Sequence, residues 1–491
     1  MKKIFTILTA CLLLASCAEF TDLKPKGMNL LSTADELELL LNVEFSDYYQ
    51  FDMYYFTGDL MSSTMGMIPN ILTQPTPSRN SILLTWDDTN LKRFAELTNH
   101  DEDYDRLFGY VGKIANPILA SVEFATGDEA KKKQIQAEAL CLRAWAEFLL
   151  VNKYAAAYNP ATAETTPGIP YLMEDWDISI PPEKWTVKQV YDQIVKDCDD
   201  AINLNALPEK NINQMRWSKA CPYAIKALAL MAMQDFDSAE VAAKQSLEIN
   251  SAVADYWSEE YTEQIMCFMN PQLYYPAVLR PMMNCPEDLF HTVTEIKFMP
   301  LRTTECDAQL EAGHAALDRM PTDGMRYMYV MSQAQMSCGV NYTMVWDMAG
   351  CGSSWNMYGL KTTQQMLIVA ECEIRKGNFA EAMGYLDDIR QGRINPEIYA
   401  PLKGNINTKE AAVAALKQTA LGENVYSIYN FIERKRWNQL DDMKETLKKN
   451  ILGTEFTLAP DSKMWIFPFP GNAVDNNPNL KQNSYDEDAT E

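Results

Sequence analysis

One spacing recurs in two distant parts of the chain and limits what it can fold into. Ala227, Phe236 and Ala239 are matched in their intervals by Ala370, Phe379 and Ala382. Each aromatic residue follows a short turn that interrupts a helical pattern. Small residues let two antiparallel helices approach closely, while the aromatic side chain fills the gap between pairs. The spacing therefore predicts two similar helix hairpins, 143 residues apart.

This packing is typical of tetratricopeptide units, and long amphipathic or helix-forming patterns surround both hairpins. The clearest are Ala137 to Tyr154, Thr186 to Leu204, Thr408 to Leu421 and Glu423 to Leu440. Between the hairpins, residues 251–355 are rich in Met, Pro, Tyr and Trp and have little periodicity. We therefore predict a mostly α-helical fold with tetratricopeptide-like helix pairs and a large irregular loop insertion, which a rigid scaffold would hold for recognition.

Other stretches predict loops or exposed surface. Residues 60–92 are rich in Pro, Asn, Ser, Thr and Met, which predicts an irregular surface loop. The acidic runs at 101–103 and 486–488 lack the spacing of a calcium-binding loop and are expected to be solvated. No cofactor and no metal are expected, and calcium at the loop oxygens has no motif to support it.

The charge balance excludes one large class of partners. The chain has 43 Lys and Arg residues against 67 Asp and Glu residues, a net charge of -24. Nucleic-acid binding depends on Lys and Arg that neutralise phosphates, so no nucleic-acid partner is expected.

Few residues suggest catalysis. Only three histidines are present, His100, His291 and His314, which leaves little for a histidine-rich metal site or a Ser-His pair. Glu138 and Arg143 lie on one predicted helix, and we interpret them as a structural hydrogen-bonding set between helices. No catalytic residue is predicted.

The first residues have the pattern of an export signal. A basic start, Met1 to Lys3, precedes an apolar stretch, Ile4 to Leu14, that is too short to span a bilayer. Leu14-Ala15-Ser16-Cys17 resembles the lipobox of a bacterial lipoprotein signal. The resemblance implies removal of residues 1–16, acylation of Cys17, for example with palmitate, and a lipidated tether at 17–27.

The cysteines divide into two groups. Cys141, Cys198, Cys221 and Cys372 lie in or beside helical patterns, which indicates small buried apolar residues. Cys267, Cys285, Cys306, Cys338 and Cys351 lie in the loop-rich middle section, where an exported protein could form disulfides.

Several segments, in order along the chain, resemble the SusD/RagB family of nutrient-binding outer-membrane lipoproteins. The early ones are Phe20 to Pro25 after Cys17, Lys113 to Leu119, Glu138 to Trp145, Gly168 to Leu172 and Thr186 to Ile194. The later ones are Ala370 to Arg390, Glu433 to Trp437, Pro468 to Pro470 and Asn476 to Asn483. Their order and their spread over nearly the whole chain make the resemblance specific.

The resemblance implies a SusD-like helical protein in two regions, 28–250 and 251–491, the second carrying the insertion and the later helix pair. It implies a lipid anchor in the outer membrane, exposure at the cell surface and a SusC-like TonB-dependent β-barrel transporter as partner. Such proteins act as a lid on the transporter, capture glycans or, in some branches, peptides, and are not enzymes.

Flat aromatic faces and neighbouring polar groups are what sugars require of a binding site. On this basis the predicted ligand-binding residues are Trp86 and Asn90 in the early loop and Tyr274, Tyr275, Trp346, Trp355 and Tyr358 in or beside the insertion. Packing of any one of these aromatic residues against the helices is the alternative. Trp145, Trp217, Trp437 and Trp465 are expected to belong to the core or scaffold.

The sequence thus predicts a surface lipoprotein that binds an oligosaccharide and delivers it to a TonB-dependent transporter. The nearest alternative is the same lid with a peptide cargo, which the acidic composition and a run of methionines between Met320 and Met348 would suit. Two further alternatives are a scaffold that binds no ligand and an exported glycoside hydrolase, which would need two facing carboxylates.

Overall fold

The computed structural model describes most of the helical part of the chain and portions of the insertion. The described residues are 31–43, 45–48, 52, 56, 72–177, 179–255, 258, 285–295, 301–303, 329–335, 341–347, 356–394, 396–397, 399–424, 427–451 and 454–483. The expectations for the signal, Cys17, Tyr274, Tyr275 and Trp355 lie outside these residues.

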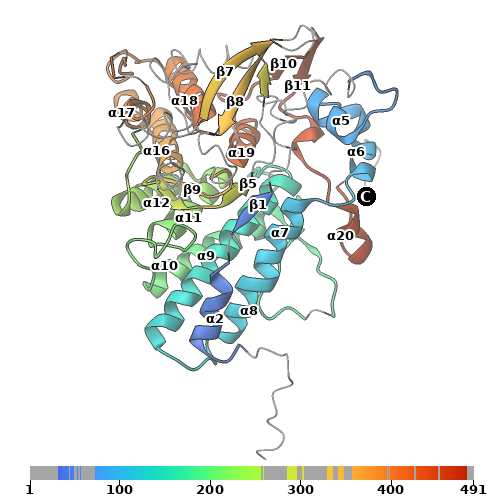
Figure 1. The fold of residues 1–491 in the computed structure, drawn as a ribbon, viewed down its shortest axis with the longest axis vertical. Coiled ribbons are helices and arrows are strands. Elements are labelled where there is room, and N and C mark those ends of the chain that lie inside the picture. Colours follow the sequence, from blue (N-terminus) through green and yellow to red (C-terminus); the bar gives the residue numbers. More distant parts are fainter. Residues whose placement is uncertain are drawn as a thin grey trace, which may run out of the picture.

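The first half of the fold is built around one long helix, α9 (Glu129–Tyr154), which is buried along most of its length from Ala137 onward. The helices around it are α2 (Ala34–Leu41), α5 (Arg79–Thr85), α6 (Leu91–Leu97), α7 (Glu102–Tyr110), α8 (Asn116–Ser121) and α10 (Val187–Leu204). Short helical turns cover Asp88–Asn90 (η2) and Val111–Ala115 (η3). Figure 1 shows α2, α8 and α10 beside α9 in the lower half of the molecule. Thr33 and Glu36 form a capping box at the start of α2.

The two predicted hairpins are confirmed as helix pairs. The first pair is α11 (Ala220–Met233) with α12 (Phe236–Ile249), and the second is α16 (Thr362–Lys376) with α17 (Phe379–Gln391). The four alanines of the recurring spacing are all completely buried. Helices α18 (Lys409–Glu423) and α19 (Ile428–Trp437) follow in the chain.

Although they are far apart in sequence, the two hairpins stack directly on each other (Figure 1). The Cys372 thiol on α16 donates to the backbone oxygen of Phe236 at the start of α12, with a separation of 3.4 Å. Lys244 on α12 contacts Glu373 on α16 at 3.1 Å. The residues between the hairpins are therefore inserted into a continuous helical stack.

Short strands were not predicted, and several lie in the insertion. Strand β4 (Asp288–Phe290) pairs with β9 (Leu360–Lys361), and β6 (Leu301–Thr303), β8 (Asn341–Asp347) and β7 (Tyr329–Gln335) form an antiparallel sheet in that order. Elsewhere β1 (Ser46–Tyr48) pairs with β5 (Val293–Glu295), β2 (Pro167–Pro170) with β3 (Lys184–Thr186), and β10 (Leu447–Ile451) with β11 (Thr454–Leu458). The fold remains mostly helical, as predicted.

Aromatic side chains join the helices to the base of the insertion. Trp217 and Phe290 stack with their ring centroids 3.8 Å apart, and the Trp145 ring lies 5.2 Å from that of Phe290. Trp437 and Trp465 are also buried, so the expectation that these four tryptophans belong to the core or scaffold is confirmed. Cys141, Cys198, Cys221 and Cys372 are buried, again as predicted.

The carbonyl groups at the end of α9 are bound by distant segments. An α-helix leaves its last four carbonyls without partners inside the helix. Here the Lys435 ammonium donates to the oxygens of Asn152 and Ala155, both at 2.6 Å. The Phe467 N–H donates to the oxygen of Lys153, and the Asn483 amide to that of Tyr154. The C-terminal segment, which contains η4 (Lys463–Trp465) and α20 (Gly471–Asn476), therefore lies against the helices.

Two loop predictions were wrong. Residues 79–85 form α5, because the Ser78 hydroxyl accepts the Ser81 N–H as a helix cap and three consecutive apolar residues, 82–84, are buried. The acidic run at 101–103 is not solvated: Asp101 and Asp103 are buried because a buried lysine, Lys153, lies between them.

Candidate functional site

The base of the insertion is fixed by a single amide side chain. The Asn356 amide nitrogen donates to Asp288 Oδ1 and to the Phe290 backbone oxygen, both at 2.9 Å. Its oxygen accepts the backbone N–H groups of Thr292 at 3.1 Å and Gly359 at 3.0 Å. All of these groups are buried, where a lost hydrogen bond is costly. Asn356 thus locks together the incoming strand β4 and the outgoing chain before β9.

Next to this lock, Tyr358 connects the insertion to the helices. Its hydroxyl donates to Asp103 Oδ1 at 3.1 Å, and its backbone oxygen accepts hydrogen bonds from Trp145 Nε1 at 2.8 Å and the Tyr429 hydroxyl at 3.2 Å. The Tyr358 side chain is only 3% exposed. In this arrangement Tyr358 anchors the scaffold, and its predicted ligand contact stays a prediction.

The hydroxyl of Tyr358 reaches a group of charges that we call the Lys153 cluster: Asp52, Arg79, Asp101, Asp103 and Lys153. Lys153 Nζ lies 2.5 Å from Asp103, 2.9 Å from Asp101 and 3.8 Å from Asp52, and Arg79 pairs with Asp52. Burial, opposed by Lys153 and reinforced by Asp101, raises the pKa of Asp103 to about 6. The cluster holds α7, α9 and the base of the insertion in one arrangement.

The predicted residues of the early segment lie at the junction of α5 and η2. Trp86 ends α5 in a left-handed conformation, with φ of 53°, and its indole N–H donates to the backbone oxygen of Phe56. The Lys449 ammonium lies 3.7 Å from the indole centroid, and Trp86 is 4% exposed. Contact between a glycan and this ring face would require Lys449 to move away, so the role of Trp86 stays a prediction.

Asn90, by contrast, lies at a partly exposed position close to exposed polar residues. Its amide donates to Asp87 Oδ2 at 2.7 Å, and Asp87 in turn caps η2 through Thr89. Asp88 and Thr89 are exposed. These groups could donate to or accept from sugar hydroxyls.

Within the insertion, the structure places one further predicted residue by its backbone. Trp346 belongs to β8 and is paired in register with Val330 of β7. Tyr342, Met344 and Trp346 occupy alternate positions of this strand, which is the central strand of its sheet. Tyr274, Tyr275 and Trp355 lie outside the described residues, although Trp355 directly precedes the Asn356 lock in sequence.

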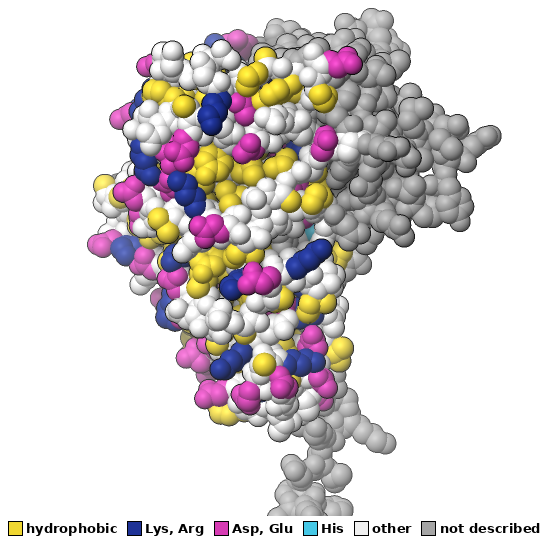
Figure 2. Space-filling model, turned by 90° about the vertical axis from the view of Figure 1, so that its left-hand side faces the viewer, with side chains coloured by type: hydrophobic (Ala, Val, Ile, Leu, Met, Phe, Trp, Pro, Cys, Tyr) yellow, Lys and Arg dark blue, Asp and Glu magenta, His cyan; other side chains and the backbone are white. Residues whose placement is uncertain are grey.

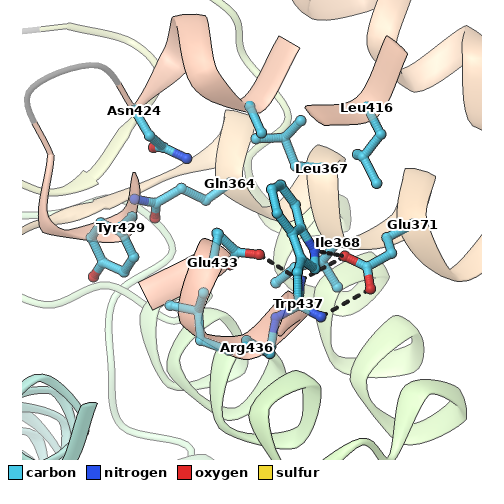
Figure 3. A pocket seen from close by; sticks show the side chains of 12 residues that line it. Gln364, Leu367, Ile368, Glu371, Leu416, Asn424, Tyr429, Glu433, Arg436 and Trp437 are labelled. Carbon is cyan, nitrogen blue, oxygen red and sulfur yellow. Dashed lines mark hydrogen bonds and ion pairs between the residues drawn. The ribbon is translucent and has the colours of Figure 1, made fainter. Parts of the chain in front are cut away.

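Figure 3 shows a small cavity at a second charge cluster, the Glu371 cluster, which comprises Glu371, Arg375, Glu433, Arg436 and Trp437. Glu371 accepts two hydrogen bonds from Arg436, at 2.9 and 2.6 Å, and one from Trp437 Nε1 at 2.9 Å. The cavity volume is about 10 Å³, which suits about one water molecule. This cavity is too small for a sugar, and the cluster joins α16 to α19.

The expected structural role of Glu138 and Arg143 is confirmed, but they do not pair with each other. Arg143 forms a two-pronged pair with Asp197 on α10, at 2.7 and 2.9 Å. Glu138 forms a similar pair with Arg216, at 2.5 and 2.8 Å. Each pair links α9 to another segment of the helical scaffold.

Sequence reasoning missed Asn356 as a lock, Lys435 as a helix cap and the Lys153 cluster. A signal existed for Lys153, because a lysine inside a long apolar helix needs buried partners. Nothing local marks Asn356 as a lock, because three of its four hydrogen-bond partners, Asp288, Phe290 and Thr292, are more than 60 residues away in sequence.

No helix among the described residues is both long enough and apolar enough to cross a lipid bilayer. In the same part of the chain no group of three or more His, Cys, Asp or Glu side chains is arranged to hold a metal ion.

Comparison with known proteins gives a family match for one part of the chain. Residues 70–229 match a SusD-like family model described as "Starch-binding associating with outer membrane". No curated protein matches the sequence.

Solved structures extend the similarity over nearly the whole chain. A SusD superfamily protein from Bacteroides vulgatus matches with a TM-score of 0.63 and 14% identity, over 92% of this chain and 99% of its own. One from Bacteroides thetaiotaomicron matches with a TM-score of 0.62 and 16% identity, over 92% and 100%. A SusD-like carbohydrate binding protein from Bacteroides vulgatus matches with a TM-score of 0.56 and 12% identity, over 91% and 97%.

At these identities the structures show the shared fold, and the family model adds a sequence match in the segment that contains α5 to α10 and most of α11. Both agree with the resemblance carried by the sequence motifs. The chain therefore has the fold of the SusD superfamily structures, and residues 70–229 match the SusD-like family model.

Proposed function

We propose that this protein binds an oligosaccharide at the cell surface and delivers it to a TonB-dependent β-barrel transporter, on which it acts as a lid. The observation that carries the proposal is the match of residues 70–229 to the SusD-like family model with its starch-binding, outer-membrane description. SusD-like proteins are carbohydrate-binding and non-catalytic, so the chain is a binding protein and not an enzyme.

The architecture supports binding by the insertion. Its base is rigid, because Asn356 and the β4–β9 pair fix both ends to a continuous helical stack. The strands that follow include β8, which carries Trp346. Recognition loops on a rigid scaffold lose less conformational entropy when a ligand binds.

The anchoring part of the proposal rests on the sequence. The Leu14 to Cys17 motif supports acylation of Cys17 and attachment to the outer membrane. A lipid anchor would keep the lid beside its transporter and raise the effective concentration of each for the other.

Calorimetric titration of the chain from residue 18 onward with plant, host and microbial glycans tests the binding function. We expect one glycan class to bind and Trp346→Ala or Trp355→Ala to weaken binding at least ~10-fold, the effect of losing an aromatic stacking partner worth about 1.5 kcal/mol. Phe124→Ala is the matched control, because Phe124 is an exposed aromatic residue outside the insertion.

Two outcomes would redirect the proposal. Binding restricted to a peptide pool would favour the peptide-carrying alternative. Failure of every glycan and peptide to bind would favour a scaffold without a ligand.

Delivery is tested by purification of the acylated protein from outer membranes in mild detergent. We expect a β-barrel protein to co-purify in a fixed ratio, and to be lost when Cys17→Ala prevents anchoring. Purification of the anchored protein alone would contradict the lid.

A further inference from the structure

An open groove lies on the stacked hairpins, and none of the predicted glycan-binding residues is among the residues that line it. We call it the α12–α17 groove, and its volume is about 540 Å³. Its lining residues are Lys244, Leu247, Glu248, Ser251, Val253, Met366, Tyr385, Asp388 and Gln391. Figure 2 faces the side of the molecule on which α12 and α17 lie and shows hydrophobic side chains in hollows bordered by acidic and basic ones.

The floor and the rim of the groove differ in chemistry. Leu247, Val253 and Tyr385 are half-buried and Met366 is almost fully buried, so the floor is apolar with a single aromatic ring. Glu248 on α12 and Asp388 on α17 are exposed. A groove of this size with an apolar floor and a few polar groups has the usual form of a binding site.

Negative charge predominates around the groove. Lys244 already contacts Glu240 at 2.6 Å and Glu373 at 3.1 Å, so its charge is matched within the protein. The charged side chains that line the groove or interact with its lining are the carboxylates of Glu240, Glu248, Glu373, Glu381 and Asp388 and the lysines Lys244, Lys376 and Lys403.

The charge of Asp388 is poorly compensated. Burial and the neighbouring Asp387 carboxylate raise its pKa, and Lys403 opposes this only in part. A positive group that enters the groove would relieve the repulsion between these two carboxylates.

We propose that the α12–α17 groove binds a polypeptide segment in which a lysine or arginine is adjacent to an apolar side chain. The apolar side chain would contact Met366 and Tyr385, and the cation would lie between Glu248 and Asp388. A glycan fits this groove less well, because only one half-buried ring is offered to a sugar face and the rim charges favour a cation over neutral hydroxyls. The inference does not depend on the proposed glycan function.

Fluorescence anisotropy with two labelled pentapeptides tests the proposal. Both have two leucines around the central residue, which is lysine in one and glutamate in the other. We expect the lysine peptide to bind at least ~10-fold more tightly, with the preference weakening as salt increases, because exposed charges are screened within about 8–10 Å at physiological salt.

Substitutions then locate the site. Glu248→Gln with Asp388→Asn should weaken binding of the lysine peptide about 10-fold, and Ser251→Arg, which adds a cation at the exposed rim, should do the same. The matched control is Glu96→Gln with Glu123→Gln, because it removes two exposed carboxylates, one on α6 and one in the turn after α8. All of these positions are exposed, so folding is expected to be unaffected.

The proposal would be overturned if the lysine peptide did not bind at millimolar concentration or if both peptides bound equally. It would also be overturned if the control variant weakened binding as much as Glu248→Gln with Asp388→Asn. Loss of glycan binding in Tyr385→Ala would also overturn it and make the groove a second carbohydrate site. Glycan binding that depends on Trp346 is measured separately, so failure of either inference leaves the other testable.

Discussion

The Lys153 cluster and the Glu371 cluster are both buried, but the pKa of Asp103 in the first is raised and that of Glu371 in the second is lowered. In the Lys153 cluster one lysine lies between two aspartates, and burial raises the pKa of Asp103 to about 6. In the Glu371 cluster burial acts in the same sense, but Arg436 and Arg375 outweigh it and lower the pKa of Glu371 to about 2. The number of cations and N–H donors per carboxylate, and not burial alone, decides whether a buried acid stays ionised.

The two clusters also join different parts of the fold. The Lys153 cluster joins α7 and α9 to the base of the insertion through Tyr358, whereas the Glu371 cluster joins α16 to α19. A substitution in the Lys153 cluster should therefore affect the position of the insertion, whereas a substitution in the Glu371 cluster should affect only the later helices.

Lys153→Met should give the largest effect. It leaves Asp101 and Asp103 buried without their cation, and breaking a buried pair costs about 3–5 kcal/mol. Urea unfolding followed by circular dichroism measures the loss. Lys188→Met is the control, because Lys188 forms an exposed pair with Asp192 and should leave the midpoint unchanged. Equal midpoints for both variants would show that the cluster does not stabilise the fold.

Glu371→Gln should lower the free energy of unfolding by less, about 3 kcal/mol. In this variant Arg436 still has its ion pair with Glu433, at 2.5 Å, and Arg375 is partly exposed to water. The contribution of the Glu371 carboxylate to stability is present above about pH 4.5 and is lost as the pH falls towards 2, because its pKa is lower in the folded protein than in the unfolded protein. When the free energy of unfolding is measured between pH 3 and pH 7, the difference between wild type and variant should become smaller as the pH falls. A gap that is constant with pH would contradict the lowered pKa.

Asp103→Asn should reverse that pH dependence. Because the pKa of Asp103 in the folded protein, about 6, exceeds its ordinary value of 3.8, the folded protein binds more protons than the unfolded protein between these values and loses stability as the pH rises through them. The asparagine variant lacks this loss, so relative to wild type it should gain about 2 kcal/mol from pH 4 to pH 7. Parallel pH profiles for the two proteins would exclude an elevated pKa.

Tyr358→Phe should have the smallest effect, about 1 kcal/mol, because it removes only the hydroxyl that donates to Asp103. This variant also separates two roles of Tyr358. A small loss of stability with unchanged glycan affinity would indicate an anchor, while a weakened affinity at unchanged stability would indicate ligand contact.

Patterns that are local in sequence predicted their structures well. The hairpins were recognisable because the alanines and the phenylalanine that make the packing lie within 13 residues of each other. The buried tryptophans were predicted from their place in helical segments or in segments that resemble the family motifs, and the structural role of Glu138 and Arg143 from their place on one helix.

Features that depend on distant partners were not predicted. Asp101 and Asp103 resembled a solvated run because Lys153 lies about 50 residues away in sequence. The partners of Arg143 and Glu138 could not be named for the same reason. Trp86 and Tyr358 have the residue types of a sugar site, but burial depends on Lys449 and Asp103, which only the folded chain brings to them.

The way α9 ends has a consequence for the order in which the protein can become folded. The carbonyls at its C-terminal end are bound by Lys435, Phe467 and Asn483, which are about 280 to 330 residues further along the chain. During synthesis the central helix is therefore made long before the groups that complete it, and its last turn stays open to water until they arrive. Because Asn483 is the last described residue, the turn cannot be completed until nearly all of the chain has been made. Incomplete chains therefore differ from finished ones in having unbound carbonyl groups at the end of α9.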